Sequence, residues 1–234
     1  MGNFSSTASS STTDGKKYDV FLSFRGEDTR YGFTSHLFDA LRRKQIETFI
    51  DNRLVRGDEI SQALLRTIGE SKIAVVIFSK DYASSKWCLR ELAEIMKYKK
   101  LNEQIVIPVF YHIDPSDVRK QIGSFKDSFA KHENELQEEV QKWREALTEA
   151  SSISGWDSSV LRPESTFVGE IVKDIWKKLN NISVSSDFPG LIGIDKHVEQ
   201  VISLLCLGVS DFGIVGIWGM GGIGKQLLLM LYSN

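Results

Sequence analysis

The chain has 234 residues, of which 41% are hydrophobic and 26% are charged, and its formal net charge is −2. This composition is typical of a globular protein that is long enough for one sizeable domain and part of a second. The near-neutral charge gives no indication of a nucleic-acid-binding surface or of a polybasic membrane patch. Because Cys88 and Cys206 are far apart and lie in apolar runs, we expect neither a disulfide framework nor a metal site, and we expect a reducing compartment.

The N-terminal segment of residues 1–15 is rich in Ser and Thr and has no Lys or Arg, so we expect it to be disordered. Its first residues fit the pattern for N-myristoylation of Gly2, although a pattern this short also matches by chance. A single acyl chain would support only weak membrane contact. No apolar run reaches about 18 residues, so we expect no transmembrane helix.

Apolar runs typical of buried strands alternate along the chain with segments of helical periodicity. The strands are expected at residues 18–24, 46–50, 72–79 and 104–111. The helices are expected at residues 32–44, 59–70, 85–100, 137–154 and 164–180, with short helical pieces within 115–134. This alternation predicts an α/β fold, a doubly wound parallel sheet with helices on both faces.

Sheets of this kind bind ligands beyond the carboxyl ends of their strands. The loops expected at that edge are rich in Gly, polar and acidic residues, and they cover residues 25–30, 51–58, 79–87 and 112–116. The helix after the third loop carries Glu91 at the margin of an apolar stripe formed by Cys88, Leu92, Ile95 and Met96. A carboxylate in that position must be paired, neutralised or used. On this pattern alone, Glu91 either reaches solvent or a nearby Arg, or it serves a site in the crevice.

The C-terminal part of the chain changes character after a polar linker at residues 181–189. An apolar run at 212–218 leads into a sequence that matches a phosphate-binding loop, with Gly219, Gly224 and Lys225 in the defining positions. Gln226 stands where this motif has a Mg²⁺-binding Ser or Thr, and the sequence after it is too short for a second acidic motif. We therefore expect residues 190–234 to be a truncated domain start with a vestigial loop that does not bind phosphate.

Four segments in order resemble the plant TIR domain, and the resemblance covers about residues 16–180. They are YDVFLSFRGEDTR at 18–30, DEI at 58–60, SKWCLREL at 85–92 and VIPVFYHIDPSDV at 106–118. Residues 187–225 are similar to the start of the NB-ARC domain of plant intracellular immune receptors. The resemblance implies a flavodoxin-like TIR fold and a TIR-NBS receptor family member that stops early in its NB-ARC domain.

Many plant members of the TIR family are similar to NAD⁺ hydrolases, and this resemblance places the catalytic acid on Glu91. It implies NAD⁺ as the substrate, with NADP⁺ as an alternative, and it implies no required cofactor and no metal. Residues that the resemblance and the expected crevice place near the substrate are Arg25, Gly26, Asp51, Ser85 and Trp87. From the residues alone, Arg25 and Gly26 equally suit a solvated turn, Trp87 a packed core position, and Asp51 and Ser85 a turn or a cap.

The resemblance also implies self-association into homo-oligomers and with other TIR domains, including full-length immune receptors. Ser35 and His36 match one association surface and Gly155 matches another, although a surface His and a Gly at a helix C-cap are ordinary alternatives. The function expected is NAD⁺ hydrolysis in plant innate immunity and cell death. The alternative is a non-catalytic adaptor that co-assembles with full-length receptors. We expect a cytoplasmic protein, with a membrane-associated or nuclear pool as further options.

Overall fold

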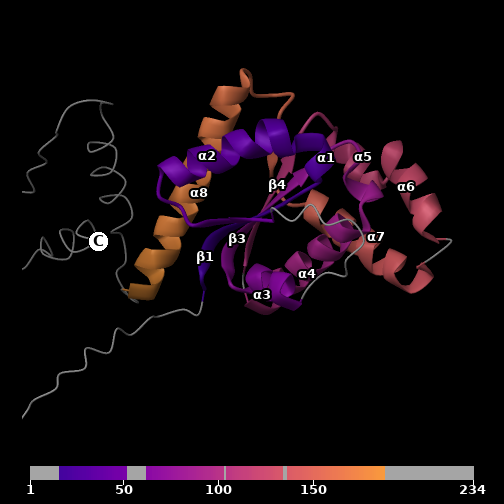
Figure 1. Ribbon diagram of the computed structural model, residues 1–234, viewed down its shortest axis with the longest axis horizontal. Coiled ribbons are helices and arrows are strands. Elements are labelled where there is room, and N and C mark those ends of the chain that lie inside the picture. The colour runs from indigo at the N-terminus through magenta and orange to yellow at the C-terminus, as the bar shows by residue number, and fades with distance from the viewer. Residues whose placement is uncertain (1–15, 52–61, 103, 134–135, 188–234) are drawn as a thin grey trace, which may run out of the picture. The chain divides into compact units, whose positions relative to one another are not determined.

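A computed structural model describes residues 16–51, 62–102, 104–133 and 136–187 of the protein (Figure 1). Several sequence-based expectations lie outside these residues. They are the disorder of residues 1–15, the acylation of Gly2, and the vestigial phosphate loop with Gly219, Gly224 and Lys225.

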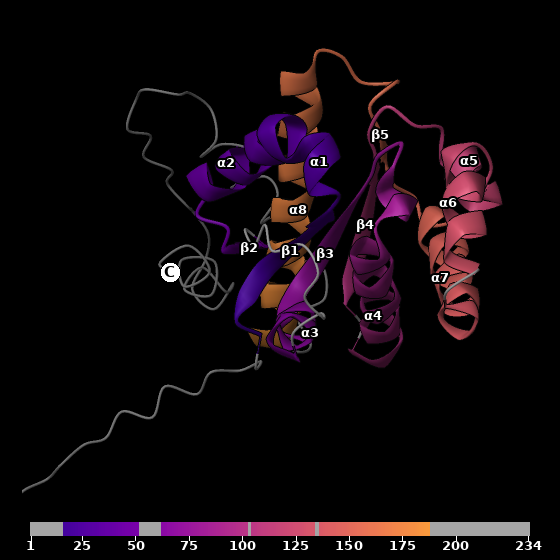
Figure 2. The ribbon, with the colours of Figure 1, turned by 45° about the vertical axis from the view of Figure 1, so that its right-hand side comes forward.

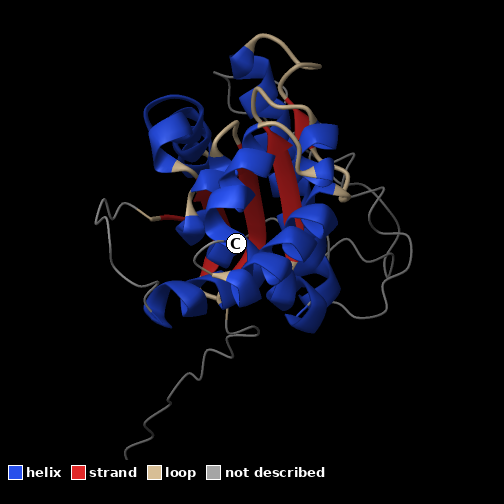
Figure 3. Cartoon of the chain, turned by 90° about the vertical axis from the view of Figure 1, so that its right-hand side faces the viewer, coloured by secondary structure: helices blue, strands red, loops and turns tan. Residues whose placement is uncertain are grey.

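The sheet has five parallel strands in the order β2-β1-β3-β4-β5. Figure 3 shows strands in red with helices in blue around them. Their bounds are β1 Tyr18–Phe24, β2 Thr48–Ile50, β3 Ser71–Phe78, β4 Ile105–Phe110 and β5 Trp156–Asp157. Phe24 pairs with Ile77, and Phe78 pairs with Phe110, so the carboxyl ends of three neighbouring strands align at one edge. This arrangement confirms the predicted doubly wound α/β fold.

The strands are connected by helical segments that follow the order expected from the sequence, with the bounds now defined (Figure 1). These segments are α1 Gly26–Thr29, η1 Arg30–Thr34, α2 Ser35–Arg43, α3 Gln62–Gly69, η2 Tyr82–Ser84, α4 Lys86–Asn102, α5 Pro115–Lys120, α6 Ser124–Glu133, α7 Gln137–Ser151 and α8 Glu164–Asp187.

Helices cover both faces of the sheet, which explains why its central strands contain continuous apolar runs, at residues 20–22 in β1 and 73–78 in β3 (Figure 2). On one face, α2 and α8 pack against alternate residues of the central strands, such as Val20 and Ile73. On the other face, α3, α4, α6 and α7 pack against the intervening residues, such as Phe21 and Ala74. In β1 and β3 both sets of side chains are buried, so neither strand shows an alternation of polar and apolar residues.

The segment after β1 differs from the expected polar turn and from a helix starting at residue 32. It forms the short α1 and a π-helical turn, η1, before α2 begins at Ser35. Gly32, with φ of −132° and ψ of −112°, is non-helical and kinks the chain within η1. A hydrogen bond of 2.8 Å from Thr34 Oγ1 to Thr29 Oγ1, both buried, ties the two turns together.

The interpretation of Gly155 as a helix C-cap is wrong, because α7 ends at Ser151 and is capped by Ser152. A Cβ atom at Gly155 would lie 2.3 Å from the carbonyl oxygen of Pro108, so glycine lets the chain pass against β4. Immediately after Gly155, the strand β5 pairs with β4. β5 has two residues and was not predicted from the sequence. A strand this short carries too little pattern to be recognised before its partner is known.

The last described helix is longer than expected. It runs from Glu164 to Asp187, so residues 181–187, assigned to a linker by their polarity, continue α8. They contain neither Gly nor Pro, and the first Pro after the helix is Pro189. Among the described residues, no helix is both long enough and apolar enough to cross a membrane.

Candidate active site

Glu91 lies near the start of α4, directly beyond the carboxyl end of β3. Ser85 fixes that start, because its Oγ accepts the N–H of Cys88 at 3.3 Å and its carbonyl accepts the N–H of Leu89 at 3.1 Å. The expected cap at Ser85 is therefore confirmed. The first turns of α4 then bring Glu91 back toward the edge where β1 and β3 end.

The Glu91 carboxyl group is held by two neutral donors. Ser23 Oγ donates to Oε2 at 2.8 Å, and Trp87 Nε1 donates to Oε1 at 2.7 Å. Glu91 is 4% exposed, so it neither snorkels into solvent nor sits on the wet face of the helix. The structure also gives Trp87 a defined polar role, in addition to its packing against the apolar core.

Burial raises the pKa of Glu91 from its ordinary value of 4.5 to about 8. The hydrogen bonds from Ser23 and Trp87 favour the carboxylate and oppose this rise, while the negative charge of Asp51 adds to it. The carboxyl group therefore changes charge near neutral pH. A cationic ligand beside it would favour the ionised form, because opposite charge stabilises a carboxylate.

Two residues of this site, Ser23 and Tyr82, were not found by the sequence analysis. Ser23 is a buried polar residue near the carboxyl end of β1, and its Oγ lies 3.1 Å from the hydroxyl of Tyr82. Tyr82 belongs to η2, is 0% exposed, and donates to the carbonyl of Cys88 at 3.1 Å. The signal that was available is the single Ser inside an otherwise apolar strand end, since a buried hydroxyl requires a partner.

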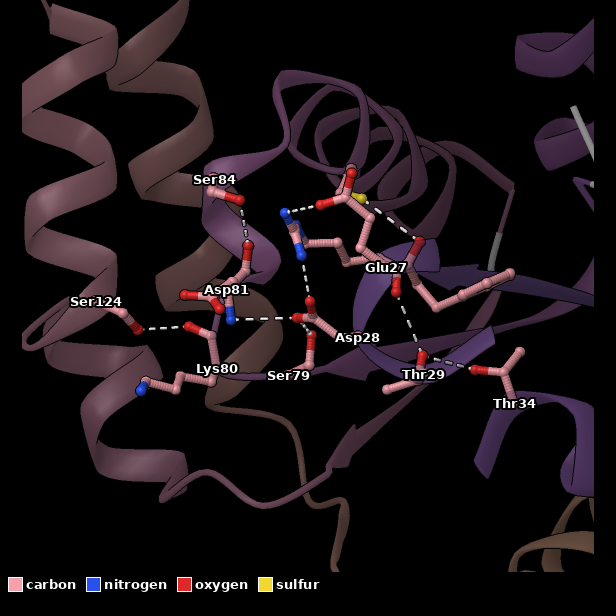
Figure 4. Close-up of polar contacts among 12 residues, drawn as sticks. Glu27, Asp28, Thr29, Thr34, Ser79, Lys80, Asp81, Ser84 and Ser124 are labelled. Carbon is pink, nitrogen blue, oxygen red and sulfur yellow. Dashed lines mark hydrogen bonds and ion pairs between the residues drawn. The ribbon is translucent and has the colours of Figure 1, made fainter. Parts of the chain in front are cut away.

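Arg25 lies in the loop after β1, as expected, and its guanidinium is paired with the carboxylates of Glu27 and Asp28. Asp28 also accepts from Ser79 Oγ at 2.5 Å and from the N–H of Asp81 at 3.3 Å, which links the loops after β1 and β3 (Figure 4). These ionic and hydrogen-bonded contacts join the segments that follow β1 and β3 at the carboxyl edge of the sheet. A role for Arg25 in phosphate binding stays a prediction.

Gly26 and Asp51 lie near the same edge, and their roles as substrate-binding residues also stay predictions. A Cβ atom at Gly26 would lie 3.0 Å from Nε of Arg30, so the glycine leaves room for that side chain. Arg30 in turn donates to the backbone carbonyl of Asp51 at 2.9 Å, which ties the loop after β1 to the end of β2. Residues 52–58, the rest of the second expected loop, lie outside the described residues.

Two of the residues expected at association surfaces, Ser35 and His36, lie at the beginning of α2. Ser35 Oγ donates to the carbonyl of Gly32 at 2.7 Å. The Nδ1 atom of His36 lies 2.9 Å from Glu164 Oε1, and the side chains of these two residues are 63% and 39% exposed. This contact joins the beginnings of α2 and α8 at the surface. Gly155 lies against β4 instead.

A polar groove of about 420 Å³ lies elsewhere on the surface, along α7. Its walls are Gln121, Gln141, Arg144, Glu145, Thr148, Glu149 and Ser152. Several of its polar groups satisfy each other, since Gln121 donates to the carbonyl of Arg144 at 2.8 Å and Arg144 donates to Gln121 at 2.6 Å. The buried acid with the raised pKa is Glu91, and it does not line this groove.

A doubly wound parallel sheet with a buried acid beyond the ends of β1 and β3 defines a flavodoxin-like α/β protein. The sequence model of the TIR domain family matches residues 17–194, and the chain therefore belongs to that family. The TIR domain that the sequence motifs predict is therefore confirmed. That the chain stops early in an NB-ARC domain stays a prediction.

Among curated proteins, the chain is 47% identical over 237 residues to disease resistance protein RPV1 of Vitis rotundifolia, covering 99% of this chain and 17% of that protein. It is 47% identical over 225 residues to TMV resistance protein N of Nicotiana glutinosa, covering 94% of this chain and 20% of that protein. The chain thus spans a fifth or less of the length of these relatives.

Among solved structures, the chain is 52% identical to the TIR domains of the activated Roq1 resistosome, which directly recognises the pathogen effector XopQ. The TM-score is 0.63, and the match covers 68% of this chain and 99% of that chain. The protein therefore carries a TIR domain of the kind found in plant disease resistance receptors.

Proposed function

We propose that this TIR domain hydrolyses NAD⁺ to nicotinamide and an ADP-ribose product, with Glu91 as the catalytic residue. The observation that carries the proposal is the buried Glu91 carboxyl group, held by two neutral donors at the carboxyl edge of the sheet. Within the described part of the chain Glu91 pairs with no cation, and a buried acid in this state is available to respond to positive charge on a ligand. NADP⁺ is an alternative substrate of the same chemistry.

The reaction suits a single carboxylate. The nicotinamide of NAD⁺ carries a positive charge, and when the bond from C1′ of the ribose to the ring nitrogen breaks, both electrons go to that nitrogen. Nicotinamide then leaves as a neutral molecule without a general acid, and positive charge develops on the ribose. A carboxylate beside that sugar stabilises the oxocarbenium ion, and water adds to C1′ with release of one proton to solvent.

Neighbouring residues support this role by holding Glu91. Trp87 and Ser23 fix both carboxyl oxygens, and Ser85 fixes the start of the helix that carries them. Arg25 and Gly26 are placed in the loop after β1, where a diphosphate would extend from a ribose above Glu91, and Asp51 ends the neighbouring strand. Their contact with substrate is part of the proposal.

The direct test measures nicotinamide release from NAD⁺ by the purified chain under crowding conditions that favour self-association. We expect Glu91→Gln and Glu91→Ala to lower the rate about a hundredfold or more. Glu94→Gln is the matched control, because Glu94 lies on the same helix and pairs with Lys97 at the surface at 2.8 Å. Equal rates in the parent protein and in Glu91→Gln would remove Glu91 from the mechanism.

A second experiment, which measures assembly and signalling, separates hydrolysis from a role as an adaptor. We propose self-association through the surface that contains Ser35 and His36, where His36 is exposed and pairs with Glu164. An adaptor without turnover predicts that Ser35→Ala with His36→Ala abolishes assembly and signalling, while Glu91→Ala leaves both intact. Hydrolysis predicts that Glu91→Ala preserves assembly, measured by light scattering, and loses signalling.

A further inference from the structure

Two buried hydroxyl groups, those of Ser23 and Tyr82, lie behind the Glu91 carboxyl group. Ser23 and Tyr82 are both 0% exposed. Contacts between oxygen atoms join them in a chain from Glu91 Oε2 to Ser23 Oγ at 2.8 Å, from Ser23 Oγ to the Tyr82 hydroxyl at 3.1 Å, and on to the Cys88 carbonyl at 3.1 Å. The carbonyl can only accept, so the direction of the chain is fixed at that end.

Each of these three contacts needs one hydrogen atom, and the hydroxyls of Ser23 and Tyr82 supply one each. Burial holds the pKa of Tyr82 well above its ordinary value, so its phenol keeps the hydrogen. With Glu91 ionised, Ser23 donates to the carboxylate, and Tyr82 then donates either to Ser23 or to Cys88 but not to both. With Glu91 protonated, Glu91 donates to Ser23, Ser23 to Tyr82, and Tyr82 to Cys88, so every contact is a hydrogen bond.

We propose that Ser23 and Tyr82 are positioning residues that form a hydroxyl relay, which retains the Glu91 proton in the resting protein and turns to stabilise the carboxylate when a cationic ligand arrives. On that arrival the carboxyl proton passes to solvent, and Ser23 changes from accepting a hydrogen bond from Glu91 to donating one. The importance of the relay for hydrolysis rests on the proposed function. Its effect on the titration of Glu91 does not.

Charged and titratable groups around the relay act on it from several elements. The carboxylate of Asp51, at the end of β2, disfavours ionisation of Glu91. Burial raises the pKa of the Cys88 thiol, so that group stays neutral, and the nearby charges of Arg25 and Asp28 act on it in opposite directions. These groups stay in place when Ser23 or Tyr82 is replaced. A difference in the Glu91 pKa between the two variants therefore reports on the hydroxyl groups themselves.

The relay predicts opposite effects for the two substitutions. Tyr82→Phe removes the acceptor of the Ser23 hydroxyl, which then finds its strongest acceptor when Glu91 is ionised, so the pKa of Glu91 falls by about half to one pH unit. Ser23→Ala removes the donor to the carboxylate, so the pKa of Glu91 rises by about one to two pH units. If either residue had a purely structural role, the two substitutions would not be expected to shift the pKa of Glu91 in opposite directions.

The test is a pH titration of the Glu91 side-chain carboxyl carbon by NMR in the full chain, with the resonance assigned by its loss in Glu91→Gln. Tyr111→Phe is the matched control, because Tyr111 also donates its hydroxyl to a carboxylate, that of Glu164 at 2.8 Å. We expect it to leave the Glu91 midpoint unchanged. In the parent protein, the Cζ resonance of Tyr82 is expected to follow the Glu91 midpoint, since Tyr82 accepts from Ser23 only below it.

A lower midpoint in Tyr82→Phe together with a higher midpoint in Ser23→Ala supports the relay. An unchanged midpoint in folded Tyr82→Phe, or shifts of the same sign in both variants, overturns it. If Tyr82→Phe does not fold, a Tyr82 Cζ resonance that stays constant through the Glu91 midpoint overturns it instead.

The NMR midpoints and the rate of hydrolysis are measured separately, so failure of the relay can be distinguished from failure of the proposed function. If Glu91 catalyses hydrolysis as its carboxylate, the acidic limb of the pH–rate profile moves with the NMR midpoint, and Tyr82→Phe is about threefold faster on that limb for a shift of half a pH unit. If the midpoints shift as expected while Glu91→Gln hydrolyses NAD⁺ at the parent rate, the proposed function fails and the relay stands.

Discussion

Replacing Glu91 by Gln removes a buried titrating group with little change in size, and it therefore measures what the charge of Glu91 does to stability. Burial raises the pKa of Glu91 from its ordinary value of 4.5 to about 8. Between these values the unfolded chain releases this proton and the folded protein retains it. The free energy of unfolding of the parent protein therefore falls as the pH rises through this window, and the contribution is constant below and above it.

The size of the effect follows from the width of the window. The interval from 4.5 to about 8 spans about 3.5 pH units, and each unit corresponds to about 1.4 kcal/mol. The parent protein therefore loses about 5 kcal/mol across the whole window relative to a variant that does not titrate there. Gln resembles the protonated form of Glu91, because its amide nitrogen can donate to Ser23 Oγ while its amide oxygen accepts from Trp87 Nε1, and any remaining cost of the replacement does not depend on pH.

The assay is urea unfolding of the parent protein and of Glu91→Gln at several pH values between about 5.5 and 7.5. The difference in the free energy of unfolding is expected to move in favour of Glu91→Gln by about 3 kcal/mol over this range. Glu94→Gln, on the same helix and paired with Lys97 at the surface, is the control and is expected to show little change. A difference between the parent and Glu91→Gln that is constant with pH would refute the reasoning.

Two further predictions concern the positions that the fold constrains most closely. Gly155→Ala places a Cβ atom 2.3 Å from the Pro108 carbonyl oxygen and is expected to cost about 1–3 kcal/mol of stability or more by urea unfolding. Its control, Gly169→Ala within α8, has nothing within 4 Å of the new Cβ atom and is expected to stabilise by about 0.5–1 kcal/mol, so equal effects would contradict the close approach. Trp87→Phe keeps a packed aromatic ring but removes the donor to Glu91 Oε1, so the NMR midpoint of Glu91 is expected to rise. An unchanged or lower midpoint would mean that the indole N–H does not stabilise the carboxylate.

The close approach at Gly155 also bears on how an association surface is tested. Gly155 matches a surface for self-association, yet a side chain at this position meets the backbone of β4. A substitution there therefore changes β4 and the adjoining β5 before it changes any contact between molecules. A loss of assembly in such a variant is informative only when its unfolding curve matches that of the parent protein.

The sequence by itself determined the elements and the layering of this domain. Long apolar runs at β1, β3 and β4 require cover on both faces, and the helical periodicity between them provides that cover. The sequence also determined that Glu91 lies at the margin of a buried stripe on a helix capped near Ser85, because both facts depend only on spacing along one helix.

Only the tertiary structure decided what surrounds Glu91. Ser23 is 68 residues away in sequence and Tyr82 is 59 residues from Ser23, and they meet because β1 and β3 are neighbours in the sheet. Periodicity reports which side of a segment is buried, and it carries no information on which buried polar groups become partners. The pairing of Arg25, the approach of Gly155 to β4 and the hydroxyl chain behind Glu91 depend on packing between elements, and each was therefore decided by the fold.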